Sequence, residues 1–297
     1  MKLLVDERRI CREDIQDMKK SSERVEIEVE GYQFKLRKSG EGRAIVLIQT
    51  WHPYAKFLAE SLPKGEKRQI ITVDIPGYYL GRQKKPIRDM DLLVRLLDQV
   101  FEKMGLSRVD LIGQCLGGVI ALKYAADYPE RVGKVVVATP PLVYFEPLVN
   151  VSVRRLFGFL NKGSLISRSA GYLMRKSILA KLARFFDGYH GLGELVFQEL
   201  RRADKKDFDD RVFFGILLSA FKLDLWEIMR QVKAPVLMVA GEKDMSGKNG
   251  KLAEVKKTMK DIRCEVIPRA RHAVVLKQTK EFNRLVLDFL VGSEAKS

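Results

Sequence analysis

Apolar and polar residues alternate near the start of the chain. Residues 25–29 alternate, Glu30 and Gly31 form a turn signal, and residues 32–36 alternate again. A period of two predicts strands that bury one face, and the short Gly-containing connection predicts that the two strands pair as an antiparallel hairpin. We expect this hairpin to form one edge of a sheet.

After the hairpin, short continuous apolar runs are separated by longer segments that carry apolar residues at three- and four-residue spacing. The short runs predict buried strands, and the longer segments predict amphipathic helices. The predicted strands are 44–48, 69–73, 109–112, 132–138, 236–240 and 264–267. The predicted helices are 54–62, 89–104, 116–128, 248–260 and 280–291. This alternation is typical of an α/β fold with a mostly parallel sheet flanked by helices.

One long interval has no strand pattern. Between residues 140 and 232 we find only helical stretches, at 151–160, 171–186, 195–200 and 212–229. An insertion of this length is too long for a loop and predicts a helical cap. We therefore expect an N-terminal arm (1–22), an α/β core (23–140 plus 231–297) and an inserted helical cap (141–230).

The strongest chemical signal is the sequence Gly113-Gln114-Cys115-Leu116-Gly117-Gly118, which links a predicted strand to a predicted helix. A nucleophile on such a sharp turn needs glycine two residues before and two residues after it, because a larger side chain would collide with backbone. The turn leaves the sulfur at a helix N-terminus, where unpaired N–H groups favour a thiolate. The segment therefore predicts a nucleophile elbow that carries a thiol.

A thiol at an elbow needs a base, and the base needs an orienting acid. Of the three histidines, His272 follows the last predicted strand, while we expect His52 to be a loop residue and His190 to lie in the cap. Asp244 follows the preceding strand, with Glu242 as the alternative acid. Both loops lie at the carboxyl ends of strands, where open α/β sheets collect functional residues.

These residues resemble the α/β-hydrolase superfamily over nearly the whole chain, from residue 23 to residue 290. The resemblance implies Cys115 as nucleophile, Asp244 as acid and His272 as general base, because the family has the same chain order of nucleophile, acid and histidine. The segment beginning at Asp74 resembles the family's Asp-x-Pro-Gly turn. The elbow itself resembles that of the polyhydroxyalkanoate synthases, which also carry Gly-x-Cys-x-Gly-Gly.

The resemblance also implies an oxyanion hole. Its donors would be the backbone N–H of Leu116, next to the nucleophile, and that of Trp51 in the loop after the strand 44–48. Here the chain departs from the family pattern, because Gln49 and Thr50 replace its His-Gly pair. Arg271 stands where many members have glycine.

Composition limits the setting of this chemistry. The three widely spaced cysteines do not suggest a disulfide framework or a zinc site, and no stretch approaches the roughly 20 apolar residues of a membrane span. We therefore expect a cytoplasmic protein with no cofactor and no metal. The net charge is +16, and residues 150–190 contain eight basic residues and one acidic residue. That segment is either a solvated surface or a site for an anionic carrier or membrane surface; nucleic acid is not the expected partner.

A thiolate leaves a tetrahedral intermediate more readily than an alkoxide, so a cysteine nucleophile suits substrates with good leaving groups. We therefore expect a hydrolase that cleaves small-molecule esters or thioesters through an acyl-Cys intermediate. One alternative is an acyltransferase that uses thioesters of the coenzyme A type, as the synthase-like elbow implies. A non-catalytic binding module on a hydrolase scaffold is the third possibility, since fold does not dictate function.

Overall fold

The computed structural model describes residues 23–49, 68–76, 85–142, 151, 155, 209–244, 251–272 and 274–291. The expected N-terminal arm, the predicted helix 54–62 and most of the expected cap lie outside these ranges. The division into arm, core and cap therefore stays a prediction.

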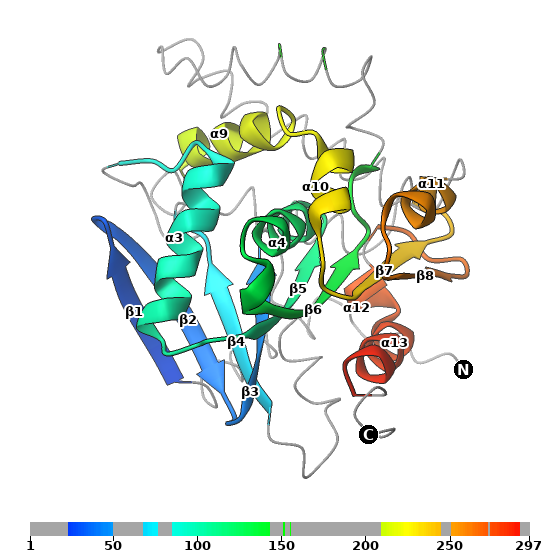
Figure 1. Ribbon diagram of the computed structural model, residues 1–297, viewed down its shortest axis with the longest axis horizontal. Coiled ribbons are helices and arrows are strands. Elements are labelled where there is room, and N and C mark those ends of the chain that lie inside the picture. Colours follow the sequence, from blue (N-terminus) through cyan, green and yellow to red (C-terminus); the bar gives the residue numbers. More distant parts are fainter. Residues whose placement is uncertain are drawn as a thin grey trace, which may run out of the picture.

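Within the described ranges, eight strands form one sheet in the order β1-β2-β4-β3-β5-β6-β7-β8 (Figure 1). The hairpin strands β1 and β2 are antiparallel to each other, β2 is antiparallel to β4, and the remaining neighbours are parallel. The expected edge hairpin and the mostly parallel sheet are confirmed. The strands are β1 (Glu23–Val29), β2 (Tyr32–Ser39), β3 (Arg43–Gln49), β4 (Arg68–Asp74), β5 (Val109–Gln114), β6 (Val132–Ala138), β7 (Val236–Gly241) and β8 (Ile262–Ile267).

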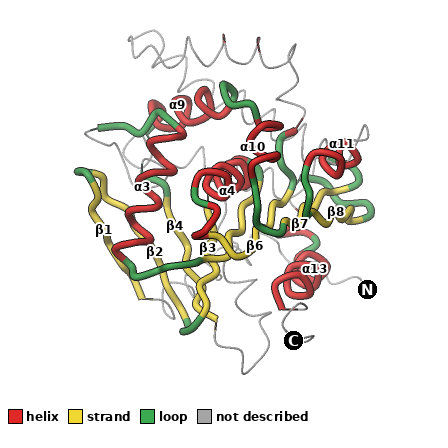
Figure 2. Tube along the Cα trace, viewed as in Figure 1, coloured by secondary structure: helices red, strands yellow, loops and turns green. Residues whose placement is uncertain are grey.

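Helices cover both faces of this sheet. They are α3 (Met90–Lys103), α4 (Leu116–Asp127), α9 (Asp210–Ala220), α10 (Leu225–Gln231), α11 (Lys251–Thr258), α12 (Val274–Lys277) and α13 (Thr279–Val291), together with the short 3₁₀ helix η1 (Pro129–Arg131). Side chains of β3 alternate between the two faces: Val46 and Ile48 pack into the core beneath α3 and α4, and Ile45 and Leu47 into the core beneath α13. In Figure 2 the strands accordingly run between α4 and α13. The central strands β5, β6 and β7 are buried along their whole length, which explains their continuous apolar sequences.

The observed helix ends differ from the predicted ones where side chains cap the backbone. Asp89, predicted as the first residue of a helix, is the N-cap of α3 and accepts a hydrogen bond from the N–H of Leu92. The stretch predicted as one helix over 212–229 is divided into α9 and α10. Asp224 caps the start of α10 by accepting from the N–H of Glu227.

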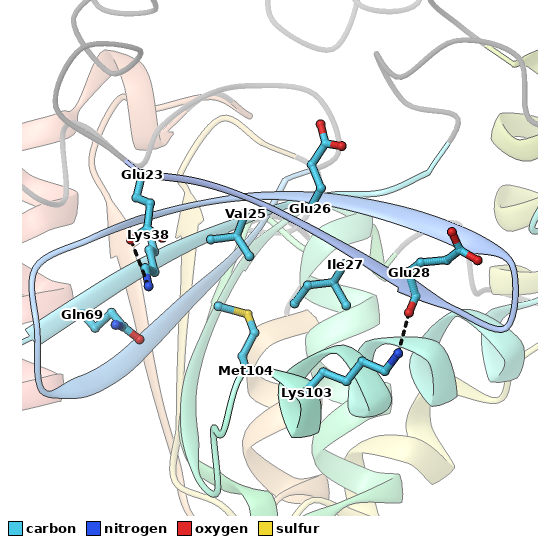
Figure 3. Close-up of a pocket in the computed structure, with 9 residues that line it drawn as sticks. All are labelled: Glu23, Val25, Glu26, Ile27, Glu28, Lys38, Gln69, Lys103 and Met104. Carbon is cyan, nitrogen blue, oxygen red and sulfur yellow. Dashed lines mark hydrogen bonds and ion pairs between the residues drawn. The ribbon is translucent and has the colours of Figure 1, made fainter.

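A groove of about 700 Å³ lies between the β1–β2 hairpin and the end of α3 (Figure 3). Val25, Ile27 and Met104 line its apolar part, and three glutamates of β1 and two lysines line its rim. Gln69, near the start of β4, also lines the groove. The groove therefore lies toward the amino ends of the parallel strands, opposite the elbow at the carboxyl end of β5. Among the described helices, none has both the length and the apolar character needed to cross a bilayer.

Candidate active site

Cys115 lies on a sharp turn between β5 and α4 at the centre of the sheet. Its backbone has φ 53° and ψ −117°, a conformation that is uncommon for a residue with a side chain. The Cys115 N–H donates to the carbonyl of Ala138 on β6 at 2.9 Å, and its own carbonyl accepts from the N–H of Gly118 at 3.0 Å. The turn is therefore held from both sides, and the thiol is partly exposed.

Two glycines make this turn sterically possible. A Cβ atom on Gly113 would lie 2.2 Å from the carbonyl oxygen of Gly117, and one on Gly117 would lie 2.5 Å from that of Ile48. Both separations are far below any normal contact, so neither position has room for a side chain. The close backbone contacts that the two glycines predicted are therefore present at the elbow.

The loops after β7 and β8 are joined by backbone hydrogen bonds. The N–H of Glu242 donates to the carbonyl of Ile267 at 3.0 Å, and that of Lys243 donates to the carbonyl of Ala270 at 2.8 Å. These bonds bring the turn that carries Asp244 against the turn that carries His272.

The His272 imidazole interacts with both Asp244 and Cys115. Nδ1 of His272 is 3.0 Å from Oδ1 of Asp244, which is 4% exposed. A carboxylate can only accept, so Nδ1 carries the proton and Nε2 is the nitrogen left for the hydrogen bond with the Cys115 sulfur. The alternative acid, Glu242, is exposed and accepts from the N–H of Arg269 at 2.7 Å. The structure thus brings Asp244, and not Glu242, to the imidazole.

The electrostatics of the three groups favour an ion pair. Burial of His272 by itself lowers the pKa of its imidazole. The Cys115 sulfur, through its charge and a hydrogen bond, and the Asp244 carboxylate outweigh burial and raise that pKa well above its usual value. The imidazole therefore keeps its proton more readily than a free histidine and faces the Cys115 sulfur, an arrangement in which it can exchange a proton with a nucleophile or a leaving group.

Two further side chains contact the backbone of His272. Nε2 of Gln114 and Oγ1 of Thr139 each donate to the His272 carbonyl oxygen at 3.0 Å. The sequence singled out Gln114 only as part of the elbow and did not single out Thr139. The one available signal was that Thr139 is a polar residue directly after a fully apolar strand.

The remaining candidate residues are placed only in part. Leu116 is the first residue of α4, where N–H groups have no acceptor within the helix. Trp51, the second expected oxyanion donor, lies outside the described residues, as do His52 and His190. Cys264 is half-buried on β8, and burial raises the pKa of its thiol to about 11, so it is a poor nucleophile.

Most of the basic segment lies outside the described residues. Of the eight basic residues in 150–190, only Arg155 lies within the described part, where it is exposed. Among the described side chains, no group of three His, Cys, Asp or Glu residues is arranged to hold a metal ion.

Known proteins resemble the chain over most of its length. A family model described as alpha/beta hydrolase fold matches residues 47–279. The chain is 24% identical to a 2-hydroxy-6-oxo-6-phenylhexa-2,4-dienoate hydrolase from Burkholderia cepacia, with 88% of this chain and 92% of that protein covered. It is 23% identical to the monoacylglycerol lipase abhd6-A from Xenopus laevis, with 81% and 71% covered. The solved structure of the enol-lactonase from Burkholderia xenovorans LB400 matches with a TM-score of 0.64 at 17% identity, covering 90% of this chain and 99% of that one.

Proposed function

Because the chain belongs to the alpha/beta hydrolase fold family, which contains hydrolases, esterases and lipases, we propose that it hydrolyses small-molecule esters or thioesters through an acyl-Cys115 intermediate. The observation that carries this proposal is the His272 imidazole, which contacts the Asp244 carboxylate at 3.0 Å and hydrogen-bonds with the Cys115 sulfur. In this reading Cys115, His272 and Asp244 form the catalytic triad.

The proposed reaction has two halves. The Cys115 thiolate adds to the acyl carbonyl, and the oxyanion accepts hydrogen bonds from the N–H of Leu116 and, as a further proposal, of Trp51. The C–O or C–S bond then breaks, and the His272 imidazolium gives its proton to the departing oxygen or sulfur, which leaves as the alcohol or thiol. In the second half neutral His272 removes a proton from water, the hydroxide oxygen adds to the acyl carbon, and the Cys115 sulfur departs as the acid is released.

A sulfur nucleophile narrows the substrate class. When the tetrahedral intermediate collapses, the better leaving group departs, so an ordinary alkoxide competes poorly with the enzyme's own thiolate. Thioesters, enol esters and other activated esters avoid this loss, because their leaving groups are about as stable as a thiolate. We therefore propose that acyl transfer to Cys115 is faster from such substrates than from simple alkyl esters.

The test is capture of the acyl-enzyme. The protein is mixed with an activated aryl ester or an acyl thioester, quenched in acid and digested, and the peptide that contains Cys115 is weighed. We expect one acyl group on this peptide, and none in Cys115→Ala. Cys264→Ala is the matched control, because it removes a half-buried thiol from an edge strand and should acylate like the wild type. Hydrolysis that persists in Cys115→Ala would contradict the proposal.

Acyl transfer is the second candidate, and the observation that favours it is the elbow sequence Gly113-Gln114-Cys115-Leu116-Gly117-Gly118, which resembles that of polyhydroxyalkanoate synthases. The same acyl-enzyme separates the two outcomes. If water removes the acyl group from Cys115 at the same rate with and without an added hydroxyacid, the protein is a hydrolase. If an ester of the hydroxyacid forms, the protein is a transferase. A protein that forms no adduct but binds anionic vesicles in a salt-sensitive way would instead be the binding module.

A further inference from the structure

We propose that Gln114 and Thr139 are positioning residues, which hold His272 in place against Cys115 by donating two hydrogen bonds to its backbone carbonyl. This inference rests on the function proposed above. Both donors lie 3.0 Å from the His272 carbonyl oxygen, and both are buried: Gln114 is 8% exposed and Thr139 is fully buried. They lie 158 and 133 residues away from His272 in the sequence, so the contacts are tertiary.

The two donors belong to the rigid centre of the sheet. Gln114 is the last residue of β5 and directly precedes Cys115, so its side chain ties the histidine loop to the elbow itself. Thr139 follows β6, the neighbouring strand, and its N–H donates to the carbonyl of Val239 on β7 at 2.7 Å. Any movement of the His272 backbone relative to the sulfur must therefore break a bond to one of two central strands.

His272 needs such support because its own strand provides little. β8 is the outermost strand on its side of the sheet, and most of its residues are only half-buried. A reactive pair must be held to within about 0.5 Å of its productive geometry. The backbone of Thr139 also has φ 44°, which is unfavourable for a β-branched residue, and this conformation places its hydroxyl at the histidine carbonyl.

The variants remove each donor while keeping the volume of the side chain. Gln114→Met and Thr139→Val delete one hydrogen bond each, the double variant deletes both, and Thr139→Ser keeps the hydroxyl. Thr258→Val is the matched control, because it deletes a hydroxyl-to-carbonyl bond of 2.9 Å in α11, away from the site. All variants are first compared by thermal unfolding.

Two measurements read the position of the imidazole. The first is the rate at which iodoacetamide alkylates Cys115 at neutral pH, with Cys264 as an internal reference. We expect a loss of about tenfold for each single variant and about a hundredfold for the double, since small misplacements of reacting groups cost this much. Thr139→Ser and Thr258→Val should alkylate like the wild type. The second is the low-field proton resonance of the His272 Nδ1–H, which should shift or broaden in each single variant and most in the double variant, and stay unchanged in Thr139→Ser and Thr258→Val.

The outcomes separate this inference from the proposed function. A folded double variant that keeps the wild-type alkylation rate and the wild-type resonance would overturn the positioning role. A wild-type Cys115 that alkylates no faster than Cys264 would overturn the acyl-Cys mechanism. In that second case the Nδ1–H resonance still decides whether Gln114 and Thr139 hold the ring, because it reports the His272–Asp244 contact and needs no reaction at the thiol.

Discussion

Gly117→Ala should slow the acylation of Cys115 and also lower the free energy of unfolding, and both effects can be worked out from one close contact. The new methyl group would lie 2.5 Å from the Ile48 carbonyl oxygen, and ordinary contacts begin near 3.4 Å, so α4 and β3 must separate by about 0.9 Å. Forced packing of this kind costs about 1–3 kcal/mol, and alanine recovers about 1 kcal/mol through its helix propensity. The net loss in the free energy of unfolding is therefore at most about 2 kcal/mol.

The same displacement acts on Cys115, two residues before Gly117 in the chain. A shift of about 1 Å between reacting groups costs about a hundredfold in rate, so we expect acylation of Cys115 to fall by that factor. The assay is the rate of acyl-enzyme formation by mass spectrometry, compared with the free energy of unfolding from urea titration. Gly105→Ala is the control: it follows α3, its φ is 70° and no atom lies within 4 Å of the added carbon.

Alanine at Gly105 should cost about 1–2 kcal/mol through backbone strain alone and leave the acylation rate unchanged. The two variants should thus lose similar amounts of stability, but only Gly117→Ala should displace the elbow. Equal rates for Gly117→Ala and the wild type, or equal slowing in both variants, would refute the reasoning.

Three other predictions concern charged groups of the protein. Asp244→Asn removes the anion that helps to raise the pKa of His272, so the imidazolium should lose its proton at lower pH. In the pH profile of ester hydrolysis, the alkaline limb should move to lower pH and the maximal rate should fall by about 10²- to 10⁴-fold. An alkaline limb at the wild-type pH would contradict this prediction. Arg43→Met removes the partner that lies 2.8 Å from the fully buried carboxylate of Asp110; because the Arg43 side chain is 35% exposed, urea titration should show a loss of only about 1.5–3 kcal/mol in the free energy of unfolding, most of it recovered by adding Asp110→Asn. Burial raises the pKa of Asp74 to about 6, above its unfolded value of 3.8, so the folded state binds the proton more tightly and the contribution of Asp74 to wild-type stability should fall by roughly 3 kcal/mol as pH rises from about 4 to about 6. Asp74→Asn should lack this fall, and a parallel fall in both proteins would contradict the assignment.

The sheet could be predicted from the sequence because its periodicity is local. Strands buried on both faces read as continuous apolar runs, as β6 does, and the edge hairpin reads as alternation, as in β2. Helix ends were less accurate, because a side chain that caps a helix has the same sequence signature as a polar first residue. Asp89 and Asp224 both lie just outside helices that the pattern alone extended over them.

The elbow could be predicted because its residues are contiguous in sequence, whereas Asp244 and His272 were predicted from their places after two strands and from the family's chain order. The glycines and cysteine of the elbow form a pattern that can be recognised without the structure. The choice between Asp244 and Glu242 depends on how two loops join, which no local pattern encodes. The contact from Thr139 to the His272 carbonyl spans 133 residues and reads in the sequence as an ordinary polar residue after a strand.

The positions of Cys115 and His272, the two groups proposed to react, have a consequence for partial unfolding. Cys115 follows β5, in the middle of the strand order, whereas His272 follows β8, at one end of it. Outer strands exchange their amide protons through local opening that leaves inner strands intact. In mild denaturant, the loop that carries His272 should therefore open while β5 and Cys115 stay folded. The rate of ester hydrolysis should then fall at a lower denaturant concentration than the one at which the circular dichroism spectrum changes.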